Sequence, residues 1–195
     1  MPEHFWFVIE GDNGAGKDTL ADRLVIDGWF LASRSSHAIA DKEQASQLTG
    51  LDRVSAFLSY NQICAKLASG HPSRSFLVRY WPSTLAAGFA DAIFDWAEFE
   101  TRVDQSMRQL PVPRLILFLR CGLDARRNRV QQRGLVPGSV DDVSEDRDVR
   151  YLRAITWLTE YMGAGYWKTL ETSKLNIEQV YQAVQSLLAE VGESS

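Results

Sequence analysis

A glycine-rich segment with one lysine lies near the start of the chain, and its residue types suit the binding of phosphate groups. It follows the apolar run 5–10 and precedes a helix-like run that begins at Leu20. Glycines let the backbone curl so that successive N–H groups point at an anion, and the following helix N-terminus adds partial positive charge. The terminal lysine can reach the end phosphates of a nucleoside triphosphate, which makes ATP the expected ligand. The residues assigned to this loop are Gly11, Asp12, Asn13, Gly14, Ala15, Gly16, Lys17, Asp18 and Thr19.

One position of the loop departs from the general pattern G-x-x-x-x-G-K-[S/T]. Asp18 stands where a hydroxyl is expected, and Thr19 follows it. Because Mg²⁺ takes hard oxygen ligands, Asp18 and Thr19 are candidate ligands for a magnesium ion that accompanies ATP. An acidic residue in the first turn of a helix is also favoured by the helix dipole alone. The sequence leaves both explanations of Asp18 open.

Composition limits the class of protein. The 195 residues, 45% of them apolar and 24% charged, suffice for one globular domain over 1–195. A net charge of −4 gives no overall attraction to nucleic acid or to an anionic membrane, so neither is an expected partner. No leader segment and no membrane-spanning run is recognised, and a cytoplasmic enzyme is expected. Cys64 and Cys121 lack metal or redox spacing and are expected to be small buried residues.

Short apolar runs alternate with longer amphipathic runs, and together they would position the loop. Strands are predicted at 5–10, 29–32, 76–78, 115–119 and 167–171, and helices at 17–27, 51–68, 83–94, 96–110, 123–132, 149–161 and 177–191. The polar residues 33–47 give no clear prediction, and 134–146 is expected to be a loop. Alternating strands and helices join through right-handed crossovers, so an α/β fold with a parallel sheet and helices on both faces is expected.

Three segments resemble the thymidylate kinase family of nucleoside monophosphate kinases, in order and spacing over most of the chain. Residues 8–17 resemble that family's first strand and phosphate loop, 79–86 its Asp-Arg-Tyr segment with the following helix, and 113–134 a later strand and arginine-rich helix. The resemblance implies a three-layer P-loop kinase fold with a small lid at about 134–147. It also implies transfer of the γ-phosphoryl group of ATP to a nucleoside monophosphate, with thymidylate or another (deoxy)pyrimidine monophosphate as the favoured acceptor.

The same resemblance assigns roles to individual residues. Lys17, Arg79 and Arg147 are the expected catalytic residues, and Arg126 and Arg129 the expected contacts to ATP. Their alternatives are a solvated basic helix face for Arg126 and Arg129, and ion pairing with neighbouring acids for Arg147. The residues expected to bind the acceptor are Arg34, Asn61, Gln62, Arg79 and Tyr80; for Tyr80 the alternative is packing against the following helix.

Several positions depart from the family pattern. Val78 and Arg120 stand where acids are expected, and 33–37 replaces the usual acceptor loop. Two other functions therefore stay open. One is a kinase of a nucleoside or another small-molecule hydroxyl, which needs a carboxylate base such as Glu10 or Asp18. The other is a catalytically decayed nucleotide-binding protein.

A homodimer is also expected. Two helices are apolar enough to offer an interface, and one carries a stripe at helical spacing whose alternative is burial in the core. The stripe consists of Ala86, Phe89, Ala90, Ile93 and Phe94.

Overall fold

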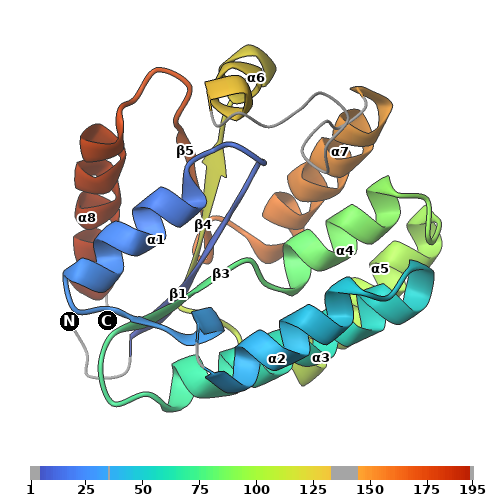
Figure 1. Cartoon of the computed structure of the whole chain (residues 1–195). Coiled ribbons are helices and arrows are strands. Elements are labelled where there is room, and N and C mark those ends of the chain that lie inside the picture. Colours follow the sequence, from blue (N-terminus) through green and yellow to red (C-terminus); the bar gives the residue numbers. More distant parts are fainter. Residues whose placement is uncertain (1–4, 35, 133–144, 194–195) are drawn as a thin grey trace.

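A computed structural model describes residues 5–34, 36–132 and 145–193, and parallel strands form the centre of this part of the chain (Figure 1). The strands are β1 (Trp6–Gly11), β2 (Phe30–Leu31), β3 (Ser75–Val78), β4 (Leu115–Arg120) and β5 (Trp167–Glu171). Their order across the sheet is β2-β3-β1-β4-β5, and every neighbouring pair is parallel. The predicted α/β fold with a parallel sheet is confirmed.

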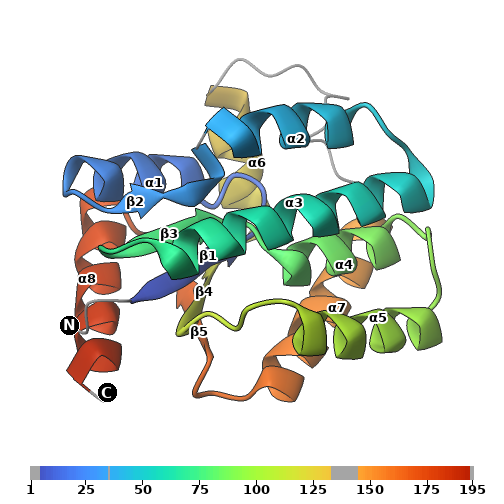
Figure 2. The same cartoon turned by 90° about the horizontal axis from the view of Figure 1, so that it is seen from below.

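Helices cover both faces of the sheet, which gives the three layers. Helices α1 and α8 lie on one face, and α3, α4, α5 and α7 lie on the other (Figures 1 and 2). The helices are α1 (Lys17–Ile26), α2 (Ser36–Ser46), α3 (Gly50–Gly70), α4 (Trp81–Ala90), α5 (Trp96–Gln109), α6 (Leu123–Gln132), α7 (Glu145–Met162) and α8 (Ile177–Glu193), with a short 3₁₀ turn at Ala32–Arg34.

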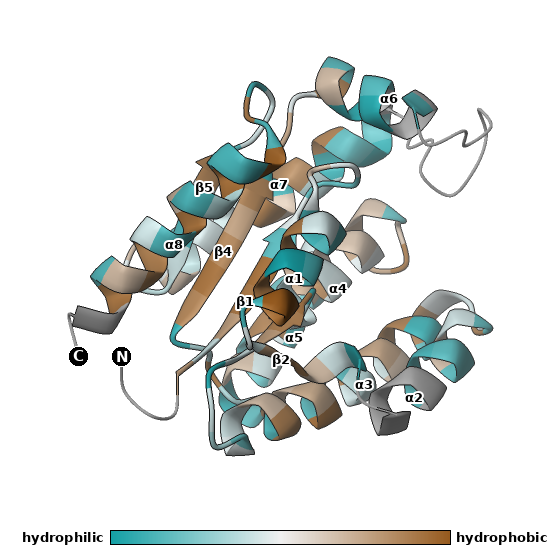
Figure 3. Cartoon of the chain, turned by 60° about the vertical axis from the view of Figure 1, so that its left-hand side comes forward, coloured by the Kyte–Doolittle hydropathy of each residue, from teal (hydrophilic) through white to brown (hydrophobic). Residues whose placement is uncertain are grey.

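The central strands are apolar on both sides because both sides are covered. In β1, Phe7 and Ile9 pack toward α1 and α8, whereas Trp6 and Val8 pack toward the opposite layer. Successive side chains of a strand point to opposite faces, so a strand buried on both faces needs an unbroken apolar run. Figure 3 shows these central strands in the hydrophobic colours. The core therefore holds β1 rigidly, and the loop that leaves its carboxyl end is anchored.

Helices α2 and α4 differ from the sequence prediction, and α7 begins at Glu145 where a helix from 149 was predicted. Helix α2 occupies part of the segment 33–47, for which no element was predicted. Its residues are compatible with a helix, but they form no clear apolar face, so no helical periodicity could be recognised. Helix α4 covers Trp81–Ala90, whereas 83–94 was predicted. It ends in a Schellman turn: Ala92 has a left-handed φ of 56°, and Ile93 N–H donates to the Gly88 carbonyl at 3.0 Å.

The stripe expected as a dimer face is not available for that purpose. Ala86, Phe89, Ala90 and Phe94 are buried in the chain's own core against α3, α5 and α7. Cys64 and Cys121 are free and buried, as expected. None of the described helices combines the length and apolarity that a membrane crossing demands.

Candidate functional site

The glycine loop leaves the carboxyl end of β1 and leads directly into α1. Gly11, Gly14 and Gly16 all have positive φ, at 142°, 76° and 94°, and Gly16 is the N-cap of α1. The ammonium of Lys17 folds back over the loop and donates to the carbonyl oxygens of Gly11 at 3.0 Å and Asp12 at 2.6 Å. Burial is the main cause that lowers the pKa of Lys17 to about 7. The loop thus has the curled backbone and the inward lysine that a polyphosphate site requires.

Close approach of β4 explains why the loop must begin with glycine. A Cβ atom on Gly11 would lie 2.2 Å from the carbonyl oxygen of Leu119, and the backbone there cannot move aside without breaking the β1–β4 ladder. We therefore expect Gly11→Ala to lower the free energy of unfolding by about 3 kcal/mol or more, the size associated with clashes and strained backbone. Urea unfolding measures this loss. Gly165→Ala is the matched control, since nothing lies within 4 Å of its Cβ position; an equal loss there would contradict the explanation.

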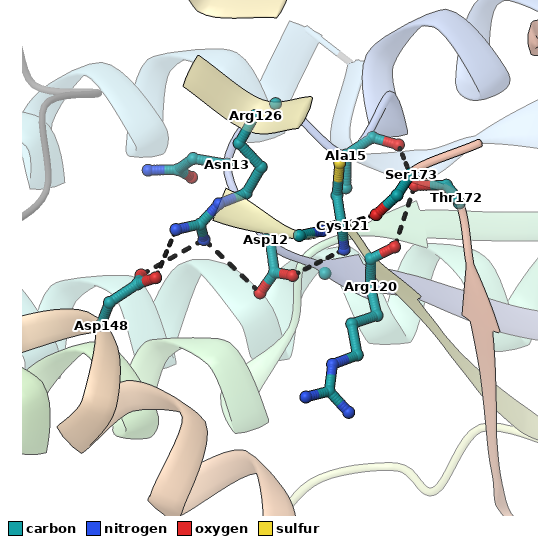
Figure 4. Close-up of polar contacts among 12 residues, drawn as sticks. Asp12, Asn13, Ala15, Arg120, Cys121, Arg126, Asp148, Thr172 and Ser173 are labelled. Carbon is teal, nitrogen blue, oxygen red and sulfur yellow. Dashed lines mark hydrogen bonds and ion pairs between the residues drawn. The ribbon is translucent and has the colours of Figure 1, made fainter. Parts of the chain in front are cut away.

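Asp12 and Arg129 fasten the loop to neighbouring elements. The Asp12 carboxylate accepts from the Cys121 N–H at 2.9 Å, just beyond β4 (Figure 4). The Arg129 guanidinium, from α6, donates to the carbonyl oxygens of Gly14 at 3.2 Å and Thr172 at 2.7 Å. Arg129, predicted to contact ATP, thus holds the backbone of the phosphate loop against the β5–α8 connection. A ligand in the loop would meet a preformed cradle.

Glu10 joins the loop to α4. This fully buried carboxylate accepts from the N–H groups of Tyr80 at 2.8 Å and Ser83 at 3.4 Å, both through Oε1, and so caps the N-terminus of α4. Its other oxygen, Oε2, has no hydrogen-bond partner within the described residues. Burial is the main cause that raises the pKa of Glu10 to about 7, against the opposing effect of Arg79. Sequence reasoning named Glu10 only as a base for a hydroxyl acceptor.

Arg79 follows β3 and turns sharply toward the loop. Its φ of 67° is left-handed, which is uncommon for a residue with a side chain. Its N–H donates to the Ile9 carbonyl at 2.9 Å, and its Nη2 donates to Asn13 Oδ1 at 2.5 Å. Strained backbone of this kind gathers at functional sites. The turn places an exposed guanidinium beside the phosphate loop.

A cleft of about 440 Å³ opens next to the loop, and it is lined by residues of α2, α3, α4, α6 and α7. Its charged lining residues are Lys42, Arg53, Arg79, Arg126 and Arg147, against the acids Asp91 and Asp148. Apolar side chains, among them Val54, Phe57 and Ile93, line it as well. Basic side chains outnumber acids, and an apolar wall accompanies them, so an amphipathic anion suits the cleft.

Both acids of the cleft are already paired with arginines. Arg126 pairs with Asp148 and lies 3.9 Å from Asp12, as Figure 4 shows. Arg147 pairs with Asp91 at 2.5 Å across the mouth, which joins α7 to the end of α4. The alternative that the sequence left open for Arg147 was pairing with acids beside it in the chain, whereas Asp91 lies 56 residues away. Neither Lys42 nor Arg53 was singled out from sequence, because single basic residues on polar helices give no signal.

Four residues that were expected to bind the acceptor do not line this cleft. Tyr80 is fully buried, and its hydroxyl donates to the Pro111 carbonyl at 2.9 Å. Asn61 is buried and donates to Thr84 Oγ1 at 2.9 Å, while Gln62 faces a smaller hollow between α3 and α5. Arg34 is exposed and pairs with Asp22 at 2.6 Å. Packing and ion pairing account for these side chains, so we leave them out of the proposed acceptor site.

The remaining predicted residues have mixed positions. Asp18 and Thr19 are exposed on the first turn of α1. The predicted lid at 134–147 lies outside the described residues up to 144, and 145–147 already form the start of α7. Arg150 and Arg153 follow Arg147 on α7, and their guanidinium groups lie over the rings of Phe89 and Trp96.

The donor set at the loop fits a magnesium ion held together with phosphates. Within the described residues there is no group of three or more His, Cys, Asp or Glu side chains that forms a protein cage for a metal. Mg²⁺ needs no such cage, since it is commonly held by one or two protein oxygens, water and substrate phosphates. Asp12 Oδ1 is a buried carboxylate oxygen without a hydrogen-bond partner, and Asp18 and Thr19 add exposed oxygens. These oxygens are the ligand type that Mg²⁺ prefers.

Comparison with known proteins places the fold. The sequence matches no family model, and a search of curated proteins finds no match. Among solved structures, thymidylate kinase from Candida albicans matches 96% of this chain and 92% of its own, with a TM-score of 0.73 and 16% identity. Deoxyadenosine kinase from M. mycoides with bound dATP matches 95% of this chain and 100% of its own, with a TM-score of 0.67 and 12% identity. The chain has the P-loop kinase fold of these proteins, so the resemblance to thymidylate kinases is confirmed at the level of the fold.

Proposed function

We propose that this protein transfers the γ-phosphoryl group of ATP to a nucleoside monophosphate, most favourably thymidylate or another (deoxy)pyrimidine monophosphate. The observation that carries the proposal is the placement of a lysine-bearing phosphate loop beside a basic cleft at the carboxyl edge of the sheet. Ligands of open α/β sheets bind at this edge. The fold shared with thymidylate kinase and deoxyadenosine kinase supports phosphoryl transfer.

The residues of the loop and the cleft match what this reaction demands. Phosphoryl transfer needs two anions held in line with their charge neutralised, and little covalent chemistry from the protein. The loop amides and Lys17 would hold the end phosphates of ATP. Arg79, exposed between the loop and the cleft, would bridge the two phosphates, with Arg126 and Arg147 neutralising charge on the cleft side.

Magnesium would be held at the loop by Asp18 and Thr19 with the phosphates, beside Asp12 Oδ1, which accepts no hydrogen bond from the part of the chain that the structure describes and lies 3.9 Å from Arg126. When bound, it would supply positive charge across the phosphate oxygens, as in other phosphoryl transfers. Asp18 would then compensate for the acid that Val78 replaces. Unchanged magnesium affinity in Asp18→Asn would contradict this role.

The charge of the cleft favours a monophosphate acceptor over a nucleoside. Asp91 and Asp148 are paired with Arg147 and Arg126, while Lys42 and Arg53 lie exposed on the cleft wall. An acceptor that carries its own phosphate would use this excess of positive charge, whereas a neutral nucleoside would not. The apolar residues between α3 and α4 would accommodate sugar and base.

One observation favours a second candidate, a nucleoside kinase. A hydroxyl acceptor must lose its proton, and Glu10 offers a buried carboxylate with one unpartnered oxygen and a pKa near neutrality. A monophosphate acceptor is already an anion and needs no such base. The two candidates therefore differ in how strongly they depend on Glu10.

A coupled assay of ADP release tests both, with ATP, Mg²⁺ and a panel of nucleosides and nucleoside monophosphates. If Glu10→Gln turns over a monophosphate at a rate within about tenfold of the wild type, the result supports the proposal. Turnover of a nucleoside that falls by about 10²-fold or more in Glu10→Gln supports the second candidate, since general bases contribute about 10²–10⁴-fold. Tight ATP binding without turnover of any acceptor would overturn both and leave a nucleotide-binding protein without catalysis.

Glu10 also predicts how stability depends on pH. Its pKa in the folded state is about 7, above the ordinary value of 4.5, so the folded protein binds more protons in this window. The contribution of Glu10 to the free energy of unfolding is full below pH 4.5 and is lost as the pH rises through 7. The total loss is about 3 kcal/mol, since each pKa unit corresponds to about 1.36 kcal/mol. We expect Glu10→Gln to remove this loss in urea unfolding at pH 5 and pH 8. Glu160→Gln, exposed on α7, should leave the loss in place; equal slopes in wild type and Glu10→Gln would contradict the assignment.

A further inference from the structure

Tyr151, on α7, carries a buried hydroxyl that makes no hydrogen bond of ordinary geometry within the described residues, although Arg79 is close enough to affect its pKa. The side chain is 7% exposed, lines the cleft and packs in the main core cluster. Four other tyrosine hydroxyls find acceptors: Tyr60 at the Ser33 carbonyl, Tyr80 at the Pro111 carbonyl, Tyr161 at Asp104 and Tyr181 at Asp27. A buried polar atom without a partner lowers stability, so its retention calls for an explanation.

Tyr151 lies near the end of the cleft that adjoins the phosphate loop. It lines the cleft together with Arg79 and with Gly11 and Asn13 of the phosphate loop. Asp148 lies one turn before it on α7, and Arg147 lies four residues before it; both line the same cleft. Tyr151 therefore lies at the end of the cleft that adjoins the phosphate loop, where an acceptor would meet ATP.

The hydroxyl is a donor there. Burial raises the pKa of Tyr151 above its ordinary value, so the group keeps its proton at physiological pH. The neighbouring Arg79 guanidinium has only donors, so it can satisfy the phenol oxygen's lone pairs but cannot take its proton. The Tyr151 hydroxyl can therefore donate its proton in a hydrogen bond to an oxygen atom of a ligand bound in the cleft.

We propose that Tyr151 is a substrate-binding residue whose hydroxyl donates a hydrogen bond to a phosphate oxygen of the acceptor, beside Arg79. This inference rests on the proposed function. Two donors from different elements, α7 and the end of β3, would then converge on the acceptor phosphate. A donor aimed at the sugar instead would act equally on nucleosides and their monophosphates.

Tyr151→Phe tests this, because it removes the unpartnered oxygen and keeps the ring. Without a ligand, the variant should gain stability, with a rise in Tm of about 2–4 °C for a chain of this size. With ATP at saturation, kcat/KM for the acceptor monophosphate should fall about 10–100-fold, because hydrogen bonds to charged groups are among the stronger ones. The KM for ATP should change less than twofold, and the acceptor Kd from calorimetry should rise in parallel.

Tyr60→Phe is the matched control. Tyr60 is equally buried in the same cluster, but its hydroxyl has a partner and it does not line the cleft. Tyr60→Phe should have a slightly lower Tm than the wild type and an unchanged kcat/KM for the acceptor, whereas Tyr151→Phe should have a higher Tm and a lower kcat/KM.

The outcomes distinguish a failure of the proposed function from a failure of the proposed role of Tyr151. A wild type that turns over no acceptor overturns the proposed function, and this inference with it. A wild type that is active, with Tyr151→Phe keeping its kcat/KM and acceptor Kd within twofold, overturns only the role of Tyr151. A loss of equal size for a nucleoside acceptor overturns the assignment to phosphate.

Discussion

Lys17→Met is expected to lower kcat/KM for phosphoryl transfer by about 10³-fold, the largest effect of any single substitution proposed for this chain. The ammonium lies within the curve of the loop, 2.6–3.0 Å from two of its carbonyl oxygens, and is nearly buried. A fixed positive charge in such a site stabilises the charge that spreads over the transferred group, and removal of comparable electrostatic donors lowers kcat by about 10²–10³. Steady-state kinetics with saturating acceptor measure the loss.

Stability should not follow activity in this variant. Burial lowers the pKa of Lys17 to about 7, which shows that the folded protein holds the ammonium against its preference for water. We expect Lys17→Met to unfold at the same urea concentration as the wild type or a higher one at pH 7. Lys66→Met, exposed on α3, is the control and should change neither property. Full activity in Lys17→Met would mean that the loop does not hold the transferred phosphate.

Arg79→Met is expected to produce the second largest loss, about 10²-fold in kcat/KM, with effects on both substrates. Its guanidinium stands between the loop residue Asn13 and the cleft, so it is placed to contact ATP and the acceptor together. Arginine binds phosphate through two parallel hydrogen bonds, so Arg79→Lys should recover only part of the activity. Kinetics with each substrate varied in turn distinguish the two contributions.

The matched control for Arg79 is Arg108→Met, an exposed arginine on α5 away from the cleft. It should leave both kinetic constants within twofold. If Arg79→Met raised KM for only one substrate and left kcat unchanged, the guanidinium would be a binding group for that substrate alone. A similar loss in Arg108→Met would point to general charge instead of position.

The phosphate loop was predictable from sequence because its determinants are local. Glycines, a lysine and the transition from an apolar run to a helix occupy a continuous stretch, and Gly11 to Lys17 adopt the curled path that such residues favour. The strands were predictable for a similar reason. Both sides of the central strands are covered, so their apolar runs are unbroken and easily recognised.

The residues of the cleft could be predicted only in part. Arg79, Arg126 and Arg147 were found through family resemblance, but Lys42, Arg53 and Tyr151 were not. Each of these three lies on a different helix, and nothing in the neighbouring sequence marks it. Conversely, Tyr80 and Asn61 were expected at the acceptor, yet neither lines the cleft: the Tyr80 hydroxyl donates to the Pro111 carbonyl, and Asn61 donates to Thr84.

The sequence by itself determined the groups that this chain offers at one end of one strand: a glycine loop with a lysine, of the kind that suits phosphate, followed by the N-terminus of a helix. The tertiary structure alone decided what stands opposite that loop. Parallel strands bring the ends of β1, β3 and β4 to one edge, and α7 then sets Arg147, Asp148 and Tyr151 against residues up to 141 positions away in the chain, such as Glu10. Such contacts depend on how the helices pack against the sheet. Packing between segments that are distant in the chain produces no periodic pattern in the sequence.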